Sequence, residues 1–340
     1  MAALPDISPA EFVRAIEARY DLRVTSPPGS LPPGVHSRAW LLATTRGSWV
    51  AKLSNPISDP LPKLERQAQL LVYLNRHAIR APQFLPSSNG SLIATLTIGQ
   101  LDFPVQLMEY EVLSRAQPET ASEATLALIG ELAARLHQIL DRYPERDAFV
   151  ADRHKSANEW GMQDQGFWPL LHDLPDHSAI PRREQEQLRA TDRRAEAYIQ
   201  RQYPDPAAIS MALLHGDLNL EHIQFLADGT PYLFDFGDMC WGPIAHELAV
   251  LFLNTFCDSA ISFAEWEALQ QRILMGYSAT RHISRLDQAM IPLFIVNRIV
   301  ARARYAAELA NEAHLAIDWQ GMKRTYELAE YLLNQAEDID

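Results

Sequence analysis

Two short motifs in the second half of the chain constrain its fold and chemistry more than any other feature. Residues 213–223 read Leu-Leu-His-Gly-Asp-Leu-Asn-Leu-Glu-His-Ile, and residues 232–238 read Tyr-Leu-Phe-Asp-Phe-Gly-Asp. Each motif places an aspartate, Asp217 or Asp235, at the end of a short apolar run typical of a β-strand, and a turn at residues 227–230 separates the two runs. This spacing predicts that both carboxylates face one site.

Such a pair of carboxylates is typical of phosphoryl transfer. One aspartate accepts the proton of the attacking hydroxyl or orients it, and the other holds a magnesium ion against the nucleotide phosphates. At these residues the chain resembles the kinase-like phosphotransferases, the group of aminoglycoside phosphotransferases, choline kinases and hydroxylysine kinases. The resemblance covers most of the chain. It implies an α+β, two-lobed protein-kinase-like fold with a small sheet-containing N-terminal lobe and a larger, mostly helical C-terminal lobe.

The family's functional residues can be carried over one at a time. Its His-Gly-Asp motif falls on residues 215–217, which implies that Asp217 is catalytic, and its metal-binding aspartate falls on Asp235. Five residues after the catalytic aspartate the family usually has a metal-binding asparagine, whereas this chain has His222. Imidazole is a softer ligand than an amide oxygen and suits manganese better than magnesium. The resemblance implies Mg²⁺ at His222 and Asp235, and the histidine makes Mn²⁺ the alternative.

Two other interpretations of this departure remain open. Asn219 is a candidate substitute ligand, because it also follows Asp217 closely and carries an amide oxygen. Alternatively, His222 is a structural histidine that hydrogen-bonds a backbone group.

A kinase-like site also needs a cation on the nucleotide phosphates. Residues 48–53 predict a strand that contains Lys52, and residues 64–74 have apolar positions at helical spacing with Glu65 in the early turns. Taken singly, a lysine and a glutamate are usually solvated surface charges. Their order ahead of the two aspartate motifs predicts that Glu65 orients Lys52 by an ion pair, as in protein kinases.

Residues 92–98 and 104–110 predict a hairpin whose second strand, by the resemblance, ends at the hinge between the lobes. The resemblance implies that the nucleotide lies against Met108, Glu109 and Glu111, largely through main-chain atoms, so that ATP and GTP are both candidates. Upstream, residues 29–38 are rich in Gly, Pro and Ser. They predict either a loop that covers phosphates or an ordinary hairpin turn. Neither a Walker A sequence nor a Gly-x-Gly-x-x-Gly sequence occurs.

Composition excludes several partners. The 340 residues contain 30 Lys and Arg against 43 Asp and Glu, a formal charge of −13, which argues against nucleic acid and favours a cationic small molecule. Two cysteines give no disulfide framework, and no apolar run is long enough to cross a membrane. The start of the chain predicts a capped helix rather than a signal peptide, so we expect a cytoplasmic protein without a membrane partner.

Hydrophobic periodicity predicts the organisation of the chain. An opening helix over residues 9–20 precedes short strands and one helix, and together they form the expected nucleotide-binding lobe of residues 1–111. The catalytic and substrate-binding lobe is expected over residues 112–340. It begins with a long helix around residues 126–140, continues through an irregular stretch at 143–181 and a charged helix at 182–202, and is helical from residue 244 onward.

The sequence says least about the identity of the acceptor. Residues 235–239 and 242–249 resemble the hydroxylysine kinase branch most. Acidic side chains at Asp238 or Glu247 are candidates for holding an ammonium group, and Trp160 or Trp168 for stacking on one. For Glu247, a buried anchor bonded to the backbone of the catalytic loop is the alternative.

Two arginines on a late helix, Arg298 and Arg302, are candidates for holding a carboxylate, or else pair with acidic groups of the protein. A zwitterionic acceptor would use both kinds of contact.

Three functions follow. The first is an ATP- or GTP-dependent kinase that transfers the γ-phosphoryl group to a hydroxyl of a cationic or zwitterionic metabolite, such as a hydroxyamino acid or amino alcohol. The second is an antibiotic phosphotransferase that acts on an aminoglycoside or a macrolide. The third is a catalytically silent kinase-like binding protein.

Overall fold

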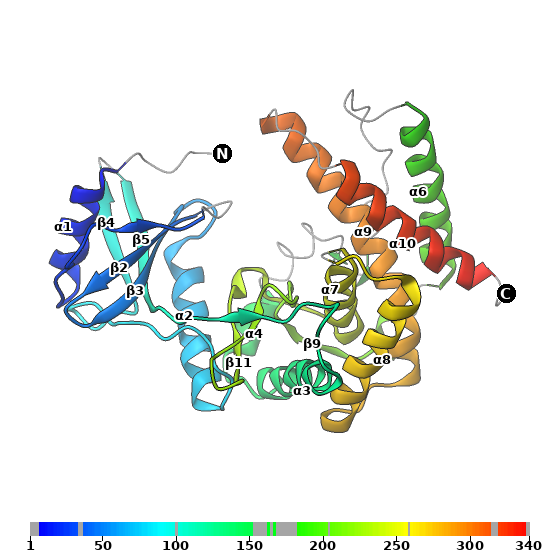
Figure 1. The fold of residues 1–340 in the computed structure, drawn as a ribbon, viewed down its shortest axis with the longest axis horizontal. Helices are drawn as coiled ribbons and strands as arrows, with labels where there is room; N and C mark the ends of the chain where they lie inside the picture. The colour runs from blue at the N-terminus through cyan, green and yellow to red at the C-terminus, as the bar shows by residue number, and fades with distance from the viewer. Residues whose placement is uncertain are drawn as a thin grey trace. The chain divides into compact units, whose positions relative to one another are not determined.

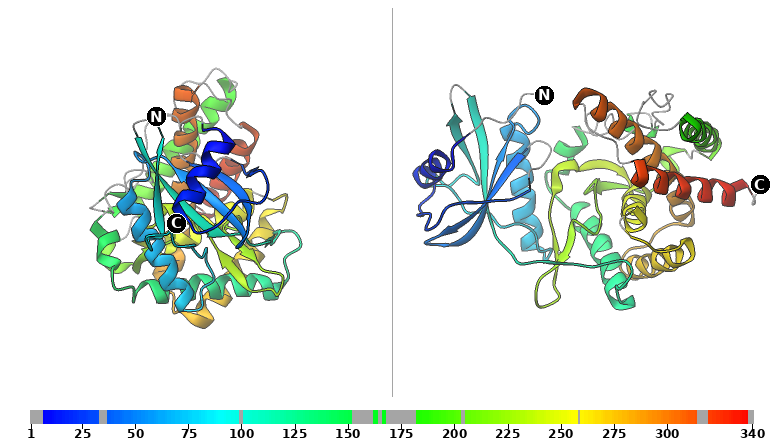
Figure 2. Two further views of the ribbon diagram at one scale, coloured as in Figure 1. Left: turned by 90° about the vertical axis from the view of Figure 1, so that its left-hand side faces the viewer. Right: turned by 45° about the horizontal axis from the view of Figure 1, so that its top comes forward.

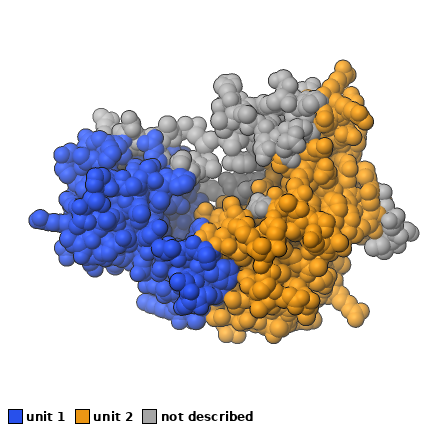
Figure 3. All heavy atoms as spheres, viewed as in Figure 1, with its two compact units in different colours: residues 1–114, 225–234 blue, residues 115–224, 235–340 orange. Residues whose placement is uncertain are grey.

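The chain folds into two compact units. The computed structural model describes residues 7–32, 37–98, 101–151, 162–163, 166–167, 182–202, 205–257, 259–313 and 319–337. Unit 1 comprises Met1–Ser114 and Phe225–Phe234, and unit 2 comprises Arg115–Gln224 and Asp235–Asp340 (Figure 3). The expected division at residue 111 differs from these units chiefly in the segment Phe225–Phe234, which groups with unit 1 although it lies between the two aspartate motifs.

Unit 1 is built on a five-stranded antiparallel sheet with the strand order β1-β2-β3-β5-β4. One helix lies on each side of this sheet, α1 on one and α2 on the other (Figures 1 and 2). The elements are α1 (Pro9–Arg19), β1 (Gly29–Ser30), β2 (Ser37–Thr44), β3 (Gly47–Ser54), α2 (Leu61–Arg76), β4 (Ile93–Ile98) and β5 (Leu101–Glu109). The predicted opening helix and the hairpin of residues 92–110 are thus confirmed.

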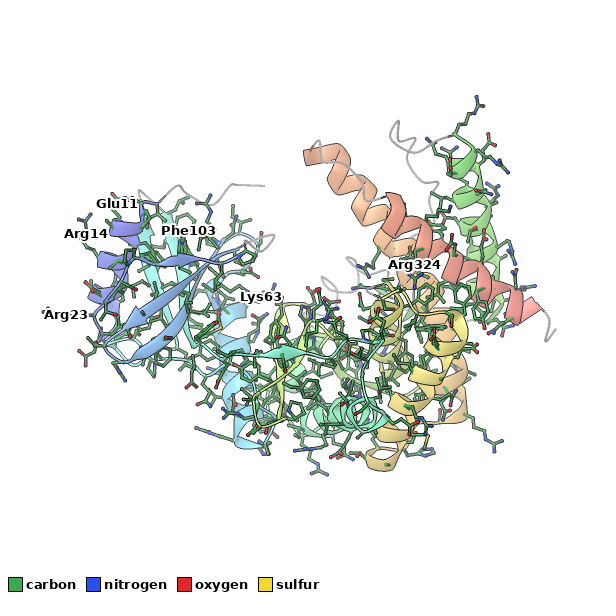
Figure 4. The ribbon with its side chains drawn as sticks, in the orientation of Figure 1. Glu11, Arg14, Arg23, Lys63, Phe103 and Arg324 are labelled. Carbon is green, nitrogen blue, oxygen red and sulfur yellow. The ribbon has the colours of Figure 1, made fainter. Side chains whose placement is uncertain are left out.

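Alternation along the strands separates the two faces of this sheet. Ala51 and Leu53 of β3 are fully buried with Phe103 of β5 in the core that also contains Phe12 of α1 (Figure 4 labels Phe103). Successive strand residues point to opposite faces, so Lys52 points away from this core. The capping box expected at the start of α1 is present, because the Ser8 hydroxyl accepts from the backbone N–H of Glu11 and the Glu11 carboxylate accepts in return.

Unit 2 is mostly helical, as expected. Its helices are α3 (Glu123–Leu140), α4 (Arg146–Ala151), α6 (Arg182–Gln202), α7 (Ile244–Cys257), α8 (Phe263–Thr280), α9 (Arg285–Ala313) and α10 (Trp319–Glu337), with 3₁₀ turns η1 (Pro206–Ala208) and η2 (Phe236–Asp238). None of the helices in the described part of the chain is long and apolar enough to span a membrane. The helix α4 falls inside the stretch that was expected to be irregular.

The remaining strands are short. They are β6 (Ser114–Arg115), β7 (Met162–Gln163), β8 (Gly166–Phe167), β9 (Met211–Leu214), β10 (Ile223–Phe225), β11 (Pro231–Leu233) and β12 (Cys240–Pro243). The pairs β7-β8 and β9-β12 form two-stranded sheets, and a three-stranded sheet has the order β11-β10-β6.

Helices α3 and α8 of unit 2 pack with their backbones in direct contact. A Cβ atom added to Gly130 of α3 would lie 1.9 Å from the Ile273 carbonyl oxygen, and one added to Gly276 of α8 would lie 2.0 Å from that of Ala127. Only glycine fits at either position, because a real Cβ would have to displace backbone rather than a flexible side chain. The two glycines therefore determine how closely these helices approach.

Candidate active site

The two aspartate motifs are brought together by the antiparallel pair β9-β12, in which Leu214 is opposite Cys240. The loop that carries Asp217 leaves the end of β9, and the turn that carries Asp235 leads into the start of β12. In an antiparallel pair, the end of one strand and the start of its neighbour lie at the same edge. The structure therefore confirms that both carboxylates emerge at one end of this small sheet, within unit 2.

Gly216 allows the loop after β9 to pass close to the turn before β12. Its φ angle is +88°, and a Cβ atom at this position would lie 1.9 Å from the Asp238 carbonyl oxygen. Both facts require glycine, since L-residues avoid positive φ and the neighbouring atom is backbone. The glycine between the histidine and the aspartate of the first motif is thus needed for the two motifs to meet.

The Glu247 carboxylate binds the backbone of this loop. Glu247 lies on α7 and is fully buried, and its oxygens accept the backbone N–H groups of His215, at 2.5 Å, and Gly216, at 3.1 Å. Burial raises the pKa of the Glu247 carboxyl, but His137 and the His215 N–H outweigh this and keep the pKa below its ordinary value. Glu247 is therefore a charged, buried anchor for the backbone of this loop, which was the alternative to a role in holding an ammonium group. Its carboxylate already accepts hydrogen bonds from the protein.

Asn219 organises the rest of the loop. Its Oδ1 atom accepts from the backbone N–H groups of Glu221 and His222, and its Nδ2 atom donates to the carbonyl oxygen of Asp217 at 3.1 Å and to Asp217 Oδ2 at 3.3 Å. The amide oxygen that a metal would need is thus already used by two backbone donors. The geometry favours a structural role for Asn219 over that of a substitute ligand.

His222 lies between the two aspartates. Its Nδ1 atom is 2.8 Å from the Asp217 carbonyl oxygen, and its Nε2 atom is 3.7 Å from Asp235 Oδ2. Because a carbonyl oxygen can only accept, Nδ1 carries the hydrogen of this bond. In the neutral imidazole Nε2 then presents a lone pair toward a carboxylate oxygen, an arrangement that suits a cation held by both atoms.

Asp235 has an unusual backbone conformation. Its φ and ψ angles are both 61°, in the left-handed region, and its side chain is 51% exposed. A non-glycine residue in this region carries a strain of about 1 kcal/mol or more, which persists where the surrounding structure enforces it. Among the described residues, no three His, Cys, Asp or Glu side chains form a ready metal cluster.

A buried arginine from α9 pairs with Asp217. Arg298 Nη2 lies 3.3 Å from Asp217 Oδ1, and the exposed fractions of the two side chains are 4% and 25%. Burial lowers the pKa of Arg298 to about 10, so the guanidinium remains charged at neutral pH. Arg302, one helical turn later, instead donates to Asn254 Oδ1 at 2.9 Å. Of the two candidate arginines, Arg298 is the one that contacts the loop carrying Asp217.

The Arg298 guanidinium also lowers the pKa of a buried histidine, His246. Burial, and secondly the charge of Arg298, lower the pKa of His246 on α7 to about 3. This imidazole is therefore neutral at physiological pH, and Arg298 is the cation beside Asp217.

Trp160 and Trp168, the two tryptophans expected near the acceptor, lie outside the described residues.

The expected nucleotide residues lie in unit 1. Lys52 pairs across the sheet with Gln106, which in turn pairs with Ile93, and Ile93 packs against Leu64 of α2. Cross-strand partners share a face of the sheet, so Lys52 lies on the side that α2 covers. Met108 also lies on this side, because it pairs with a residue two positions before Lys52 in β3.

Main-chain hydrogen bonds reduce the number of backbone groups that the expected hinge can offer to a nucleotide. The N–H of Glu109 donates to the Gln83 carbonyl oxygen and the N–H of Tyr110 donates to that of Ser48, which leaves neither for a nucleotide. The Glu111 carboxylate lies 3.6 Å from Arg80 Nη2. β1 and β2 form an antiparallel pair in which Ser30 is opposite Trp40, and residues 33–36 of the Pro-rich segment lie outside the described part of the chain.

Glu65 is exposed on α2, and within the described part of the chain no ion pair joins it to Lys52. We still predict that the two act together when nucleotide is bound. Lys52→Ala should lower kcat/KM by about a hundredfold because it removes a positive charge from the phosphates. Glu65→Ala should cost about tenfold, and the double variant should be no worse than Lys52→Ala alone.

The measurement is a double-mutant cycle on steady-state kinetics. Lys63→Ala is the matched control, because Lys63 lies on the same helix as Glu65 and pairs with Asp59, at 3.0 Å (Figure 4 labels Lys63). Strictly additive losses would show that Lys52 and Glu65 never meet.

His222 gives a second prediction. If Nε2 is a metal ligand, His222→Asn should retain activity with magnesium and reduce any preference for manganese, whereas His222→Phe should raise the metal concentration at half-maximal activity about tenfold or more. The measurement is a titration of wild type and both variants with each metal. An unchanged metal dependence of His222→Phe would assign the histidine a structural role.

Comparisons with known proteins identify the family of this chain. The sequence profile of the phosphotransferase enzyme family matches residues 30–288, and the chain belongs to this family. A homoserine kinase from Sinorhizobium medicae is 25% identical over 300 residues, which cover 86% of this chain and 82% of that protein. A homoserine kinase from Rhodopseudomonas palustris is 25% identical over 280 residues, 78% of this chain and 77% of that protein.

Solved structures show the fold. An amicoumacin kinase superposes with a TM-score of 0.66 at 15% identity, covering 91% of this chain and 88% of its own. A spectinomycin phosphotransferase superposes with a TM-score of 0.67 at 11% identity, covering 96% and 99%. The predicted protein-kinase-like α+β fold is confirmed, as is the prediction of a phosphotransferase that acts on a hydroxyl group.

Sequence reasoning missed two residues that lie behind the loop carrying Asp217. His137 of α3 and Tyr277 of α8 are fully buried, and His137 Nε2 lies 3.6 Å from Glu247 Oε2. The only local signal was a histidine at a core position of an otherwise apolar helix. Such a histidine is more often a satisfied core residue than a functional one.

Proposed function

We propose that this protein is an ATP- or GTP-dependent kinase that phosphorylates the hydroxyl group of a small zwitterionic metabolite, with homoserine as the first acceptor to test. The observation that carries the proposal is the contact between Asp217 and the buried cation Arg298. It sets a candidate base for a hydroxyl beside a group that binds carboxylates. Relatives named homoserine kinase, of which the chain matches 82% in the case of the Sinorhizobium medicae protein, support the same acceptor class.

Asp217 is the proposed catalytic residue. Asn219 and Arg298 hold its two carboxylate oxygens, at 3.3 Å each, so that the side chain is oriented before an acceptor arrives. An oriented carboxylate can align a hydroxyl for in-line attack and receive its proton as the bond to phosphorus forms. The leaving group is then the nucleoside diphosphate.

Lys52, with Glu65 as its partner, is proposed to bind the nucleotide phosphates, and Met108, Glu109 and Glu111 to lie along the base. A neighbouring structure of an amicoumacin kinase was solved with AMP-PNP and Ca²⁺, which supports a nucleotide and a divalent cation here. His222 and Asp235 would hold that cation, whose chemistry is to offset charge on the phosphates. We propose Mg²⁺, with Mn²⁺ as the alternative.

For the acceptor, we propose that Arg298 holds a carboxylate and Asp238 an ammonium group. The carboxylate would share the guanidinium with Asp217, because Arg298 has five N–H donors in a planar fork. Trp160 remains a proposed contact from the sequence alone.

The test is a nucleotide-consumption assay with three acceptors that differ by one group. Homoserine carries both charges, 3-aminopropan-1-ol lacks the carboxylate, and 4-hydroxybutanoate lacks the ammonium group. We expect kcat/KM for homoserine to exceed that for each analogue by about tenfold to a hundredfold, the value of a charged hydrogen bond. Arg298→Leu should remove the advantage over 3-aminopropan-1-ol. Equal rates with all three would contradict the zwitterionic acceptor.

A second candidate is an antibiotic phosphotransferase, which the spectinomycin and amicoumacin neighbours favour. It uses the same catalytic residues, so only the acceptor separates the two. Adding spectinomycin and an aminoglycoside to the same panel tests it. Phosphorylation of an antibiotic together with no turnover of homoserine would replace the first proposal.

A further inference from the structure

Two buried polar side chains connect the packing of α3 and α8 to the catalytic loop. His137 and Tyr277 both have no exposed surface, and His137 Nδ1 lies 2.8 Å from the Tyr277 hydroxyl. Burying a polar group costs free energy unless it finds a partner, so this pair is retained only where its contacts compensate that cost. The second ring nitrogen of His137, Nε2, faces the carboxylate of Glu247.

The hydrogen positions of this pair follow from its surroundings. Burial raises the pKa of Tyr277, so its hydroxyl keeps its hydrogen. His137 Nε2 faces Glu247 Oε2 at 3.6 Å and has no hydrogen-bond partner in the described part of the chain. A lone pair directed at a buried carboxylate would be repelled, so Nε2 carries a hydrogen. In the neutral ring, Nδ1 then accepts the hydrogen bond from Tyr277, which stabilises this tautomer and the ring orientation.

Glu247 is the point where this chain of contacts reaches the loop. Its carboxylate has no exposed surface and receives the N–H groups of His215 and Gly216 from the loop itself. His137 supplies positive potential from outside the loop. A buried carboxylate is stable only when such donors surround it, and its position depends on all of them.

We infer that His137 and Tyr277 are positioning residues for phosphoryl transfer, acting through Glu247 on the backbone that carries Asp217. The inference rests on the proposed function only in taking Asp217 as the catalytic residue. Both side chains have no exposed surface, so we expect them to act on the rate of the chemical step rather than on binding.

The close crossing of α3 and α8 explains how the two side chains meet. Tyr277 follows Gly276 directly, and His137 lies two helical turns after Gly130. Because these glycines bring the two backbones into contact, the phenol and the imidazole reach hydrogen-bonding distance. The helix crossing thereby determines where the imidazole faces Glu247.

The first test does not depend on activity. Hydrogen exchange of the backbone amides in residues 211–220 is measured for wild type, Tyr277→Phe and His137→Leu. We expect the His215 and Gly216 amides to exchange about tenfold faster in both variants, because their acceptor is less well held. Exchange elsewhere in unit 2 should change little. Loop amides that keep wild-type exchange in Tyr277→Phe would overturn the inference, whether or not an acceptor has been found.

The second test is kinetic, with homoserine and Mg-ATP as the probes. Tyr277→Phe should lower kcat about threefold to tenfold with KM for both substrates within about twofold, and adding His137→Leu should cost no more than His137→Leu alone. His137→Gln keeps an N–H donor near the Nε2 position, so it should recover part of the activity lost in His137→Leu. If homoserine is not a substrate, the proposed function fails and the exchange measurement still decides the inference.

Tyr326→Phe is the matched control. The Tyr326 hydroxyl is also buried and also donates a hydrogen bond between two helices, but its acceptor is Asp192 Oδ1, at 2.8 Å, and the helices are α10 and α6. We expect this variant to lose stability comparable to Tyr277→Phe, with wild-type kcat and wild-type exchange in the loop. Equal kinetic losses in the two tyrosine variants would show that stability alone, and not positioning, lowers the rate, and would overturn the inference.

Discussion

Asp217→Asn is expected to lower kcat by about a thousandfold or more while nucleotide affinity stays within about twofold of wild type. The variant keeps the size of the side chain but cannot accept the hydroxyl proton. It also leaves the buried charge of Arg298 with a neutral partner at 3.3 Å, so a lower Tm should accompany the kinetic loss. Turnover by nucleotide consumption and binding by calorimetry, both well below the Tm, separate these two effects.

The control for this prediction is Glu221→Gln. Glu221 lies in the same loop, is 60% exposed and pairs with Arg115 at 2.9 Å. An exposed pair of this kind contributes little, so the variant should keep wild-type turnover. If Asp217→Asn also keeps turnover within a few-fold of wild type, Asp217 is not the base.

Gly216→Ala is expected to have the next largest effect, with kcat lowered by about a hundredfold and unfolding made easier by about 3 kcal/mol. The new methyl group would meet the Asp238 carbonyl oxygen at 1.9 Å, in a backbone conformation of φ +88° that alanine avoids. Relief of this clash must separate the loop of Asp217 from the turn that carries Asp235. Thermal unfolding and steady-state kinetics on the purified variant measure both consequences.

Gly229 is a control that separates the effect of the clash with Asp238 from the effect of a positive φ angle. Gly229 has φ +82°, and a Cβ atom there would find nothing within 4 Å. Gly229→Ala should therefore cost only about 1 kcal/mol, from the positive φ, and leave turnover unchanged. Losses of the same size in the two variants would mean that the approach to Asp238 has no part in the effect.

Local patterns predicted the elements that carry the candidate site. The helix of α1 followed from Ser8 and Glu11 at capping-box spacing, and the strand of Lys52 followed from its apolar run, because these signals depend on neighbours in sequence. The short turn at residues 227–230 predicted that Asp217 and Asp235 lie near each other, but this turn joins β10 to β11. The two aspartates meet because β9 pairs with β12, which the sequence pattern did not show.

Contacts between distant residues were not predictable in the same way. Arg298 and Asp217 are 81 positions apart, and His137 and Tyr277 are 140 apart. Periodicity indicates which face of a helix is buried, but not which partner it meets. Arg298 could be proposed only as one of two arginines, and the contact with the loop distinguishes it from Arg302. The grouping of Phe225–Phe234 with unit 1 was missed for the same reason.

The paired glycines of α3 and α8 have a consequence for engineering this enzyme. A contact made of backbone alone has no side chain that can repack, so it cannot absorb substitutions gradually as an ordinary core does. Libraries that vary positions 130 and 276 should lose folded members first, whereas surface positions of α6 and α10 should tolerate change. Libraries made to select for new acceptors should therefore leave the helix pair behind the loop as it is.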